Sequence, residues 1–169
     1  FLKDIFGDFS FPSEYREIKS VFQSNAEKID VYFDVEQMEK VFFNILSNAY
    51  KFTQDGGKIE MLVEEKENSV DIRVVDNGKG IAPQYLNKLF VNFFQVYDHG
   101  NQNTGYGIGL ALSKSIVELH QGGLTVESRL AQNNKTGRTC FTITLLKGNA
   151  HFAPGQLRTD MVLQESRAI

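Results

Sequence analysis

Residues 34–52 constrain the fold more than any other part of the sequence. Asp34 stands where a helix N-cap belongs, and apolar residues then recur at the three- and four-residue spacing of an amphipathic helix. These apolar positions are Met38, Val41, Phe42, Ile45, Leu46 and Ala49. The turn sequence Asp55-Gly56-Gly57 ends the pattern. We therefore expect one long helix with a single face on the core.

Other apolar patterns predict a sheet around this helix. Short or alternating apolar runs indicate strands at residues 18–22, 29–33, 59–63, 70–75, 124–128 and 139–145. Helical spacing predicts helices at residues 1–9, ended by Pro12 and Ser13, and at 83–90. A further helix should start at Gly107, with Ile108, Leu112, Ile116 and Leu119 on one face. The sum is an α+β fold, a two-layer sandwich of a mixed or largely antiparallel sheet packed against helices.

The composition disfavours several classes of protein. The 169 residues suffice for one compact domain, and the net charge of −3 disfavours a nucleic-acid binder. The single cysteine, Cys140, leaves no disulfide framework or cysteine-based metal site and fits a reducing compartment. No apolar run approaches the ~20 residues that span a bilayer, and no signal peptide is evident. We expect a cytoplasmic domain at residues 1–147, followed by a tail or linker at 148–169.

The long helix also carries a polar stripe. Asn44, Asn48 and Lys51 have the spacing i, i+4, i+7, so they lie together beside the core stripe. Asparagine is unfavourable inside a helix, whereas amide oxygens suit a hydrated Mg²⁺ and lysine suits phosphate. A solvated helix face explains the same triplet, so this segment alone leaves both interpretations open.

Two further segments are rich in glycine. Asp76-Asn77-Gly78-Lys79-Gly80 follows a predicted strand; its glycines permit a sharp turn, and its carboxylate can accept a hydrogen bond from an amine such as that of adenine. An ordinary turn explains this segment too. Gly105-Tyr106-Gly107-Ile108-Gly109-Leu110 opens a helix, where backbone N–H groups bind phosphate. It does not directly follow a strand, as a dinucleotide-binding fingerprint would, and the chain has no P-loop sequence.

In this order and spacing, the segments resemble the catalytic, ATP-binding domain of bacterial sensor histidine kinases over residues 1–146. Residues 34–53 resemble the N box of that family, 76–81 the G1 box, 89–94 the F box and 105–110 the G2 box. Thr139-Cys140-Phe141 resembles the closing strand. The resemblance implies the Bergerat (GHKL) fold, with the polar residues 97–104 as a mobile lid over the nucleotide.

The resemblance also implies roles for the matching residues. Asn48 would coordinate Mg²⁺ with Asn44 close by, Lys51 would reach the phosphates, and these three are the implied catalytic residues. Asp76 would accept the adenine amino proton. The other implied nucleotide-binding residues are Phe52, Gly78, Gly80, Ile81, Gly105, Tyr106, Gly107, Ile108, Gly109, Leu110 and Thr139. Lys40 and Asn92 depart from the usual family sequence, which often has Gln and Pro there.

Asn44 separates the classes that share this fold. Gyrase B, Hsp90 chaperones and MutL hydrolyse ATP with a glutamate as general base at this position, and anti-sigma serine kinases resemble them. An amide cannot take a proton, whereas phosphoryl transfer to histidine needs mainly positioning and charge neutralisation. The implied activity is therefore transfer of the ATP γ-phosphoryl group to a histidine on a separate dimerisation helix. The alternative is a nucleotide-sensing or interaction module that has lost this chemistry.

No histidine of the chain matches the acceptor of the family. His120 ends a predicted helix, His99 lies in the predicted lid and His151 in the tail. We expect the chain alone to bind ATP and to phosphorylate nothing. The implied partners are the histidine-bearing dimerisation domain and a response regulator or receiver domain of a two-component phosphorelay. The resemblance also implies a cytoplasmic domain of a membrane-bound sensor kinase, with no direct membrane insertion of this domain. The tail from Gly148 resembles the segment before the receiver domain of hybrid kinases, and a plain linker explains it equally.

Overall fold

A computed structural model describes residues 1–13, 16–95, 106–132, 136–153 and 155–157. Its strands form one mixed sheet in the order β1-β2-β3-β5-β4, in which β1 and β2 are parallel and the other neighbours antiparallel. The strands are β1 Lys19–Ser24, β2 Lys58–Glu65, β3 Ser69–Asp76, β4 Gly123–Arg129 and β5 Arg138–Leu146. The helices of the described residues are α1 Leu2–Ser13, α2 Val35–Phe52, α3 Pro83–Leu86 and α4 Gly109–Leu119.

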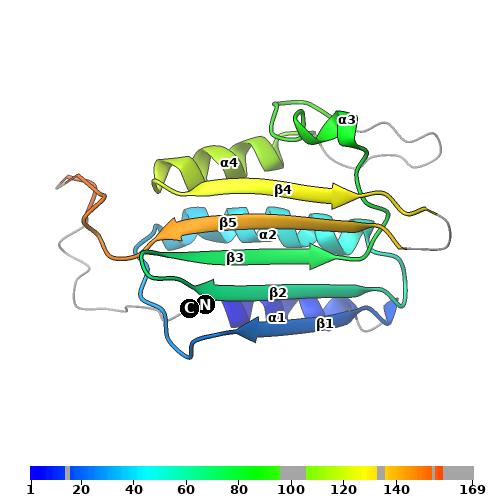
Figure 1. Ribbon diagram of the computed structural model, residues 1–169, viewed down its shortest axis with the longest axis horizontal. Helices are drawn as coiled ribbons and strands as arrows, with labels where there is room; N and C mark the ends of the chain where they lie inside the picture. The colour runs from blue at the N-terminus through cyan, green and yellow to red at the C-terminus, as the bar shows by residue number, and fades with distance from the viewer. Residues whose placement is uncertain (14–15, 96–105, 133–135, 154, 158–169) are drawn as a thin grey trace.

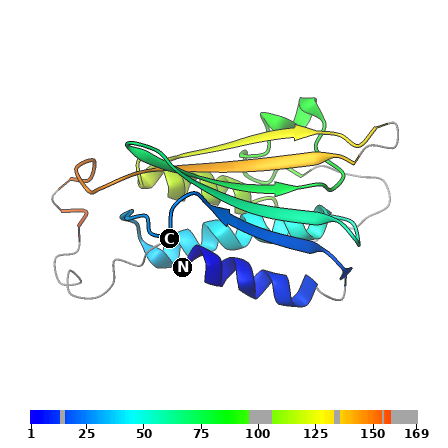
Figure 2. The same ribbon diagram turned by 60° about the horizontal axis from the view of Figure 1, so that its bottom comes forward.

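The longer helices α1, α2 and α4 lie on one face of the sheet, with α2 behind its centre (Figures 1 and 2). Every second residue of β2, β3 and β5 points into the layer between sheet and helices, because side chains alternate along a strand. Fully buried side chains of this core include Phe42, Ile45, Met61, Ile72 and Ile143. The predicted α+β two-layer sandwich is confirmed.

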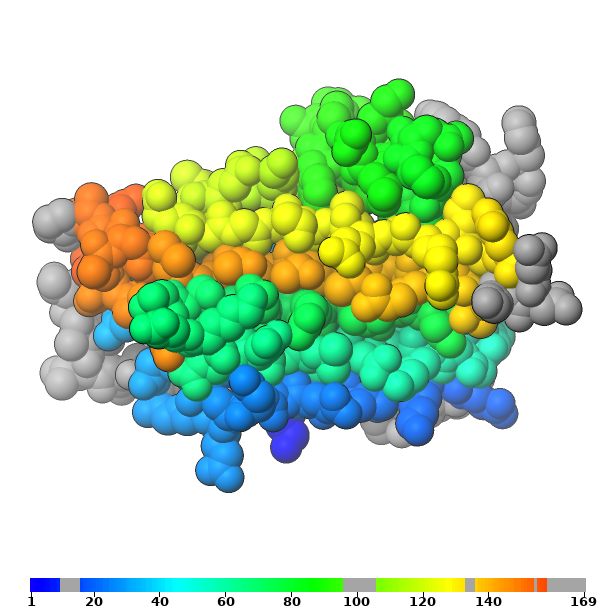
Figure 3. Space-filling view, in the orientation of Figure 1, coloured from blue at the N-terminus to red at the C-terminus, as the bar shows by residue number. Residues whose placement is uncertain are grey.

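The other face of the sheet is polar and open. Figure 3 shows it in the orientation of Figure 1, with no helix over the strands. Ion pairs join Arg73 to Glu64 and Lys66 to Asp71, each at 2.5 Å. Burial would raise the pKa of Asp71, but the hydrogen bonds from Lys66 and Thr144 outweigh it and lower this pKa. These paired charges lie on the side of the strands that faces water, opposite the side that faces the core.

Helix α2 is fixed at both ends. The Asp34 carboxylate accepts a hydrogen bond from the Gln37 N–H at 3.1 Å, which confirms the predicted N-cap. At the other end, the Arg16 guanidinium donates to the carbonyls of Tyr50 and Thr53, each at 2.6 Å, and pairs with Asp55. A cation on free carbonyls stabilises a helix C-terminus, so both ends of the helix that carries the polar stripe are held.

The prediction of a strand at residues 29–33 is wrong. In the sheet, β1 pairs only with β2, and Val31 makes no more than an isolated bridge to Gly148. Ile29 is buried and Phe33 packs on Phe1, with ring centroids 5.3 Å apart. Alternate side chains of this loop are buried or half-buried against the core, which produces a strand-like pattern without strand pairing.

Three helix boundaries also differ from the predictions. Helix α1 continues through Pro12 to Ser13, and α3 ends at Leu86, with turns after it. Helix α4 begins at Gly109, because Gly107 has φ +69°, which is not helical. The predicted face of α4 is partly wrong as well. Leu112 and Leu119 are exposed, whereas Ala111, Ser113, Ile116 and Val117 are buried.

Candidate nucleotide-binding site

The loop at residues 76–81 lies directly against the end of α2. The Lys79 N–H donates to the Phe52 carbonyl at 3.4 Å. A Cβ atom on Gly78 would lie only 2.2 Å from the same carbonyl oxygen, so no other residue fits at this approach. The last residue of α2 and the loop after β3 therefore form one continuous surface.

The opposite side of this loop is held by the connection between β4 and β5. Gly80 has φ +74°, and a Cβ atom there would lie 2.0 Å from the Arg129 carbonyl oxygen. The Ala131 N–H donates to the Lys79 carbonyl at 3.1 Å. Both observations explain the glycine at position 80, and together they fix the loop between α2 and the far strands.

A serine hydroxyl joins the same loop to the two far strands. Ser128 Oγ accepts from the Ile81 N–H at 2.8 Å and donates to the Arg138 carbonyl at 2.8 Å. It also lies 3.1 Å from the Thr139 hydroxyl, and Thr139 is the direct cross-strand neighbour of Asp76. Sequence reasoning missed Ser128, because a serine at the end of a strand carries no signal of its own.

Asp76 is a buried carboxylate at the mouth of this loop. It is 5% exposed, and within the described residues its only hydrogen bond comes from the Gly78 N–H, at 3.0 Å. Burial raises the pKa of Asp76 to about 6, while the Gly78 N–H and the positive charge of Arg138 partly lower it. The group is therefore mostly ionised at pH 7 and can accept one more hydrogen bond from a ligand.

Asn44, the first residue of the polar stripe of α2, faces the start of α4. The Asn44 side-chain NH₂ donates to the Gly109 carbonyl at 3.2 Å and to the buried Ser113 hydroxyl at 3.3 Å. A Cβ atom on Gly109 would lie 2.9 Å from Asn44 Oδ1, so the glycine permits this close contact. The side-chain amide of Asn48, one turn further on, has no hydrogen-bond partner in the described part of the chain. Its amide is therefore available to a ligand.

Two lysines converge on Phe52. The ammonium of Lys51 lies 5.2 Å and that of Lys79 5.1 Å from the centre of the Phe52 ring, within the range of cation–π attraction. Only Lys51 was singled out from the sequence. Both cations are placed beside the end of α2, where an anionic ligand bound to the 76–81 loop would meet them.

The entry to α4 is tied to the segment before the predicted lid. The Phe93 N–H donates to the Gly107 carbonyl at 2.8 Å, and a Cβ atom on Gly107 would lie 2.7 Å from the Phe94 carbonyl oxygen. Tyr106 is 86% exposed, Ile108 is also exposed, and Leu110 is partly buried. Gly105, His99 and the predicted lid at 97–104 lie outside the described residues.

His120 has a structural position far from this site. The Asp34 N–H donates to His120 Nε2 at 2.9 Å, so the neutral ring carries its proton on Nδ1, which lies 2.7 Å from the Ile116 carbonyl. The Nδ1 contact therefore lies within α4, and Nε2 joins the end of α4 to the N-terminus of α2.

One chain of contacts thus connects the predicted site residues. Asn44 meets Gly109, Phe52 meets Gly78, and Asp76 lies opposite Thr139. The described residues contain no group of three or more His, Cys, Asp or Glu side chains that could hold a metal. Side-chain amide oxygens, without carboxylate ligands around them, fit an Mg²⁺ ion that takes most of its ligands from phosphate and water.

Residues 33–149 match the family described as histidine kinase-, DNA gyrase B- and HSP90-like ATPases. The chain is 34% identical over 169 residues to histidine kinase P4 of Formosa agariphila and 32% identical over 150 residues to the heme sensor protein HssS of Staphylococcus aureus. These alignments cover 98% and 89% of this chain but 12% and 30% of the two relatives. The chain thus spans less than a third of either relative. It belongs to the histidine kinase-, gyrase B- and HSP90-like ATPase family.

Solved structures share the fold. The catalytic domain of histidine kinase ThkA matches with a TM-score of 0.73 at 24% identity, over 86% of this chain and 90% of that domain. The mycobacterial sensor histidine kinase MprB matches with a TM-score of 0.71 at 23% identity, over 86% and 95%. Among the described residues, no helix combines the length and the apolar character needed to cross a bilayer.

Proposed function

We propose that this chain is the catalytic domain of a sensor histidine kinase, binding Mg-ATP and donating its γ-phosphoryl group to a histidine on a separate dimerisation helix. The observation that carries this proposal is Asn44. At the position where the hydrolases of this fold need a general base, the side chain is an amide, and it is engaged with α4 through Gly109 and Ser113. Such a group can hold geometry but cannot activate water.

In the proposed mechanism, Asp76 selects the base. Its carboxylate has one oxygen on the Gly78 N–H, which leaves acceptor capacity for the adenine amino group. The contacts of Gly78 and Gly80 with the backbones of Phe52 and Arg129 keep the loop rigid, so little ordering is needed on binding. Thr139 lies beside Asp76 on the neighbouring strand, where its hydroxyl would face the same ring.

The phosphate end of the site would be formed by α2 and the start of α4. Asn48 would hold Mg²⁺, with Asn44 close to it, and the bound ion would neutralise the phosphate charge that develops during transfer. Lys51 would bind the phosphates, and Lys79 also lies close to the Phe52 ring. The hydrogen bond from Asn44 to Gly109 would set the distance between α2 and α4, the two helices that would bind the phosphates.

The partners follow from this chemistry. We propose a histidine-bearing dimerisation domain as phosphoryl acceptor and a response regulator or receiver domain as the next one, with the catalytic domain in the ATP-containing cytoplasm. ThkA, a structural neighbour, has been solved in complex with the response regulator protein TrrA. We expect no nucleic-acid partner, in keeping with the net charge of −3.

A transfer assay tests the proposal. The chain is incubated with γ-labelled ATP and Mg²⁺, alone and with a separately produced histidine-bearing hairpin of a histidine kinase. We expect slow release of phosphate and no labelled protein from the chain alone, and an acid-labile, base-stable phosphohistidine on the hairpin. Rapid hydrolysis without the hairpin would instead favour an ATPase, and nucleotide binding without transfer would favour a module that has lost the chemistry.

A further inference from the structure

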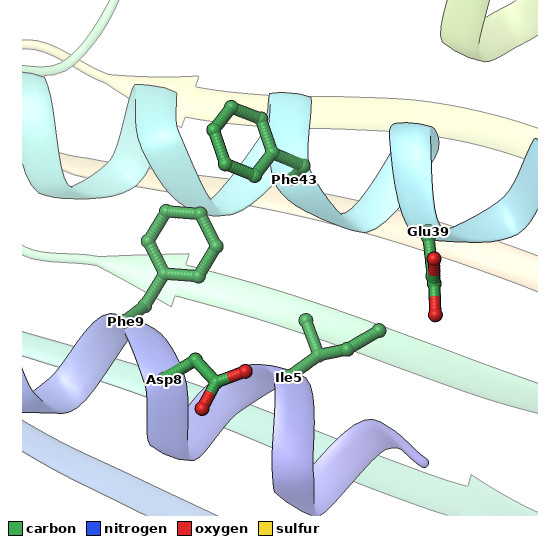
Figure 4. Close-up of a pocket in the computed structure, with 5 residues that line it drawn as sticks. All are labelled: Ile5, Asp8, Phe9, Glu39 and Phe43. Carbon is green, nitrogen blue, oxygen red and sulfur yellow. The ribbon is translucent and has the colours of Figure 1, made fainter. Parts of the chain in front are cut away.

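A hollow on the helix side of the molecule, away from the candidate site, is lined by Ile5, Asp8, Phe9, Glu39 and Phe43. We call it the α1–α2 groove; its volume is about 470 Å³. Figure 4 shows its lining, with Phe9 of α1 and Phe43 of α2 directed toward one another. Their ring centroids are 5.2 Å apart, and Phe9 also stacks on Tyr50 at 5.7 Å.

The aromatic side chains of the groove are more exposed to solvent than those of the core. Phe43 is 61% exposed, whereas its neighbour Phe42 is fully buried. On α1, Leu2 and Phe6 are the residues that enter the core, and Ile5 and Phe9 lie between core and solvent. Contiguous exposed apolar side chains with a polar rim are typical of interaction surfaces.

The rim of the groove is acidic. Asp8 on α1 and Glu39 on α2 are exposed, and neither has an ion-pair partner in the part of the chain that the structure describes. The carboxylates of Glu64 and Asp71, on the open face of the sheet, are in contrast each paired with a cation. The groove therefore attracts a cationic partner and repels a second copy of itself, an anionic lipid surface or a nucleic acid.

The walls of the groove decide the form of the partner. Both walls are helices, whose backbone groups are already paired along their length, so an extended peptide would find no backbone partners there. A helix satisfies its own backbone and can place apolar side chains at i, i+4 and i+7 between the two walls. Helix α1 has 12 residues, so it can accompany a partner helix over ~18 Å, or about three turns.

We propose that the α1–α2 groove is a docking site for an amphipathic helix of another protein. The apolar face of that helix is flanked by lysine or arginine. The apolar stripe covers Ile5, Phe9 and Phe43, and the flanking cations pair with Asp8 and Glu39. Asn44 projects from α2 toward α4, so this docking leaves the proposed nucleotide site open. The proposal does not depend on the identity of the nucleotide.

Two helical peptides of about 14 residues provide the test. Both carry leucine at i, i+4, i+7 and i+11, and the flanking positions hold lysine in one and glutamate in the other. Binding to the whole chain is measured by fluorescence anisotropy, and the contacted residues are located by amide chemical shifts. We expect the lysine peptide to bind at least about tenfold more tightly than the glutamate peptide and to shift α1 and α2 signals.

Matched variants distinguish binding in the groove from nonspecific attraction to the protein surface. Phe43→Ser should weaken lysine-peptide binding at least about tenfold, while Leu119→Ser, at a position 71% exposed on α4, should leave it unchanged. Asp8→Lys with Glu39→Lys should reverse the preference between the peptides, and Glu127→Lys on the open sheet face should not. Thermal unfolding checks that each variant is folded.

Several outcomes would overturn the proposal. These are no lysine-peptide binding at ~1 mM, equal affinity for both peptides, or equal losses in Phe43→Ser and Leu119→Ser. Dimerisation of the chain that Phe43→Ser abolishes would assign the groove to self-association instead. Binding to phosphatidylserine vesicles that depends on Phe43 would assign it to a membrane surface.

Discussion

Replacing Asp76 by asparagine should stabilise this chain when no nucleotide is bound. The folded protein holds a carboxylate that is 5% exposed, with its pKa raised by burial to about 6 from an ordinary 3.8. Each pH unit between these values costs about 1.4 kcal/mol, so ionised Asp76 destabilises the fold by about 3 kcal/mol at pH 7. Asparagine keeps an oxygen that can accept from the Gly78 N–H. It also adds a buried NH₂ group, which costs about 1 kcal/mol and reduces the gain in stability by that amount.

The sign of the pH dependence follows from the raised pKa. Between about pH 4 and pH 6 the folded state holds a proton on Asp76 that the unfolded state has lost, so this group lowers stability as pH rises through that window. Above pH 6 the cost is constant. Asp71, whose pKa is lowered, is present in both proteins, so a comparison of the two isolates Asp76.

Urea and thermal unfolding at pH 4.5 and pH 7.5 measure this difference. At pH 7.5 we expect Asp76→Asn to be about 2 kcal/mol more stable than the native chain, a rise in Tm of roughly 4–8 °C at this chain length. Near pH 4.5 the gap should largely close. A native chain that is as stable as the variant at pH 7.5, or a gap independent of pH, would refute the reasoning.

Three further substitutions test other parts of the site. Asn48→Ala should remove most of the Mg²⁺-dependent gain in nucleotide affinity and leave metal-free binding nearly unchanged; calorimetry that finds equal losses in both conditions would contradict the metal role. Ser128→Ala removes the acceptor of the Ile81 N–H and should weaken nucleotide binding about fivefold to tenfold, with rescue in Ser128→Thr; unchanged binding in the alanine variant would exclude a positioning role. Gly80→Ala places a Cβ atom 2.0 Å from the Arg129 carbonyl at φ +74° and should cost at least about 2 kcal/mol in urea unfolding, so native stability would show that the loop is not held as described.

The parts of the fold that were predicted correctly from the sequence are those determined by residues close together in the chain. The N-cap at Asp34 and the buried stripe of α2 depend only on residues within the helix, and the structure has both. The strands at residues 59–63 and 70–75 are bounded by turn residues and alternate in burial, so their pattern was also sufficient.

The errors arose where tertiary contacts decide. Helix α4 is apolar around much of its circumference, and its buried face was settled by packing on α2, which selects Ser113 over Leu112. Arg16 and Ser128 act on groups 34 and 47 positions away in the chain, so no local pattern could indicate them. The segment at residues 29–33 had the burial period of a strand, but in the described residues it pairs no further than the isolated bridge of Val31 to Gly148.

Calorimetric titration with a non-hydrolysable ATP analogue, with and without Mg²⁺, tests the central claim most directly. We predict binding that Mg²⁺ strengthens, that Asp76→Asn abolishes although the variant is folded, and that the guanine analogue does not reproduce. No binding at millimolar concentrations in either condition would contradict the claim that Asp76, Asn48 and Gly78 belong to a nucleotide site.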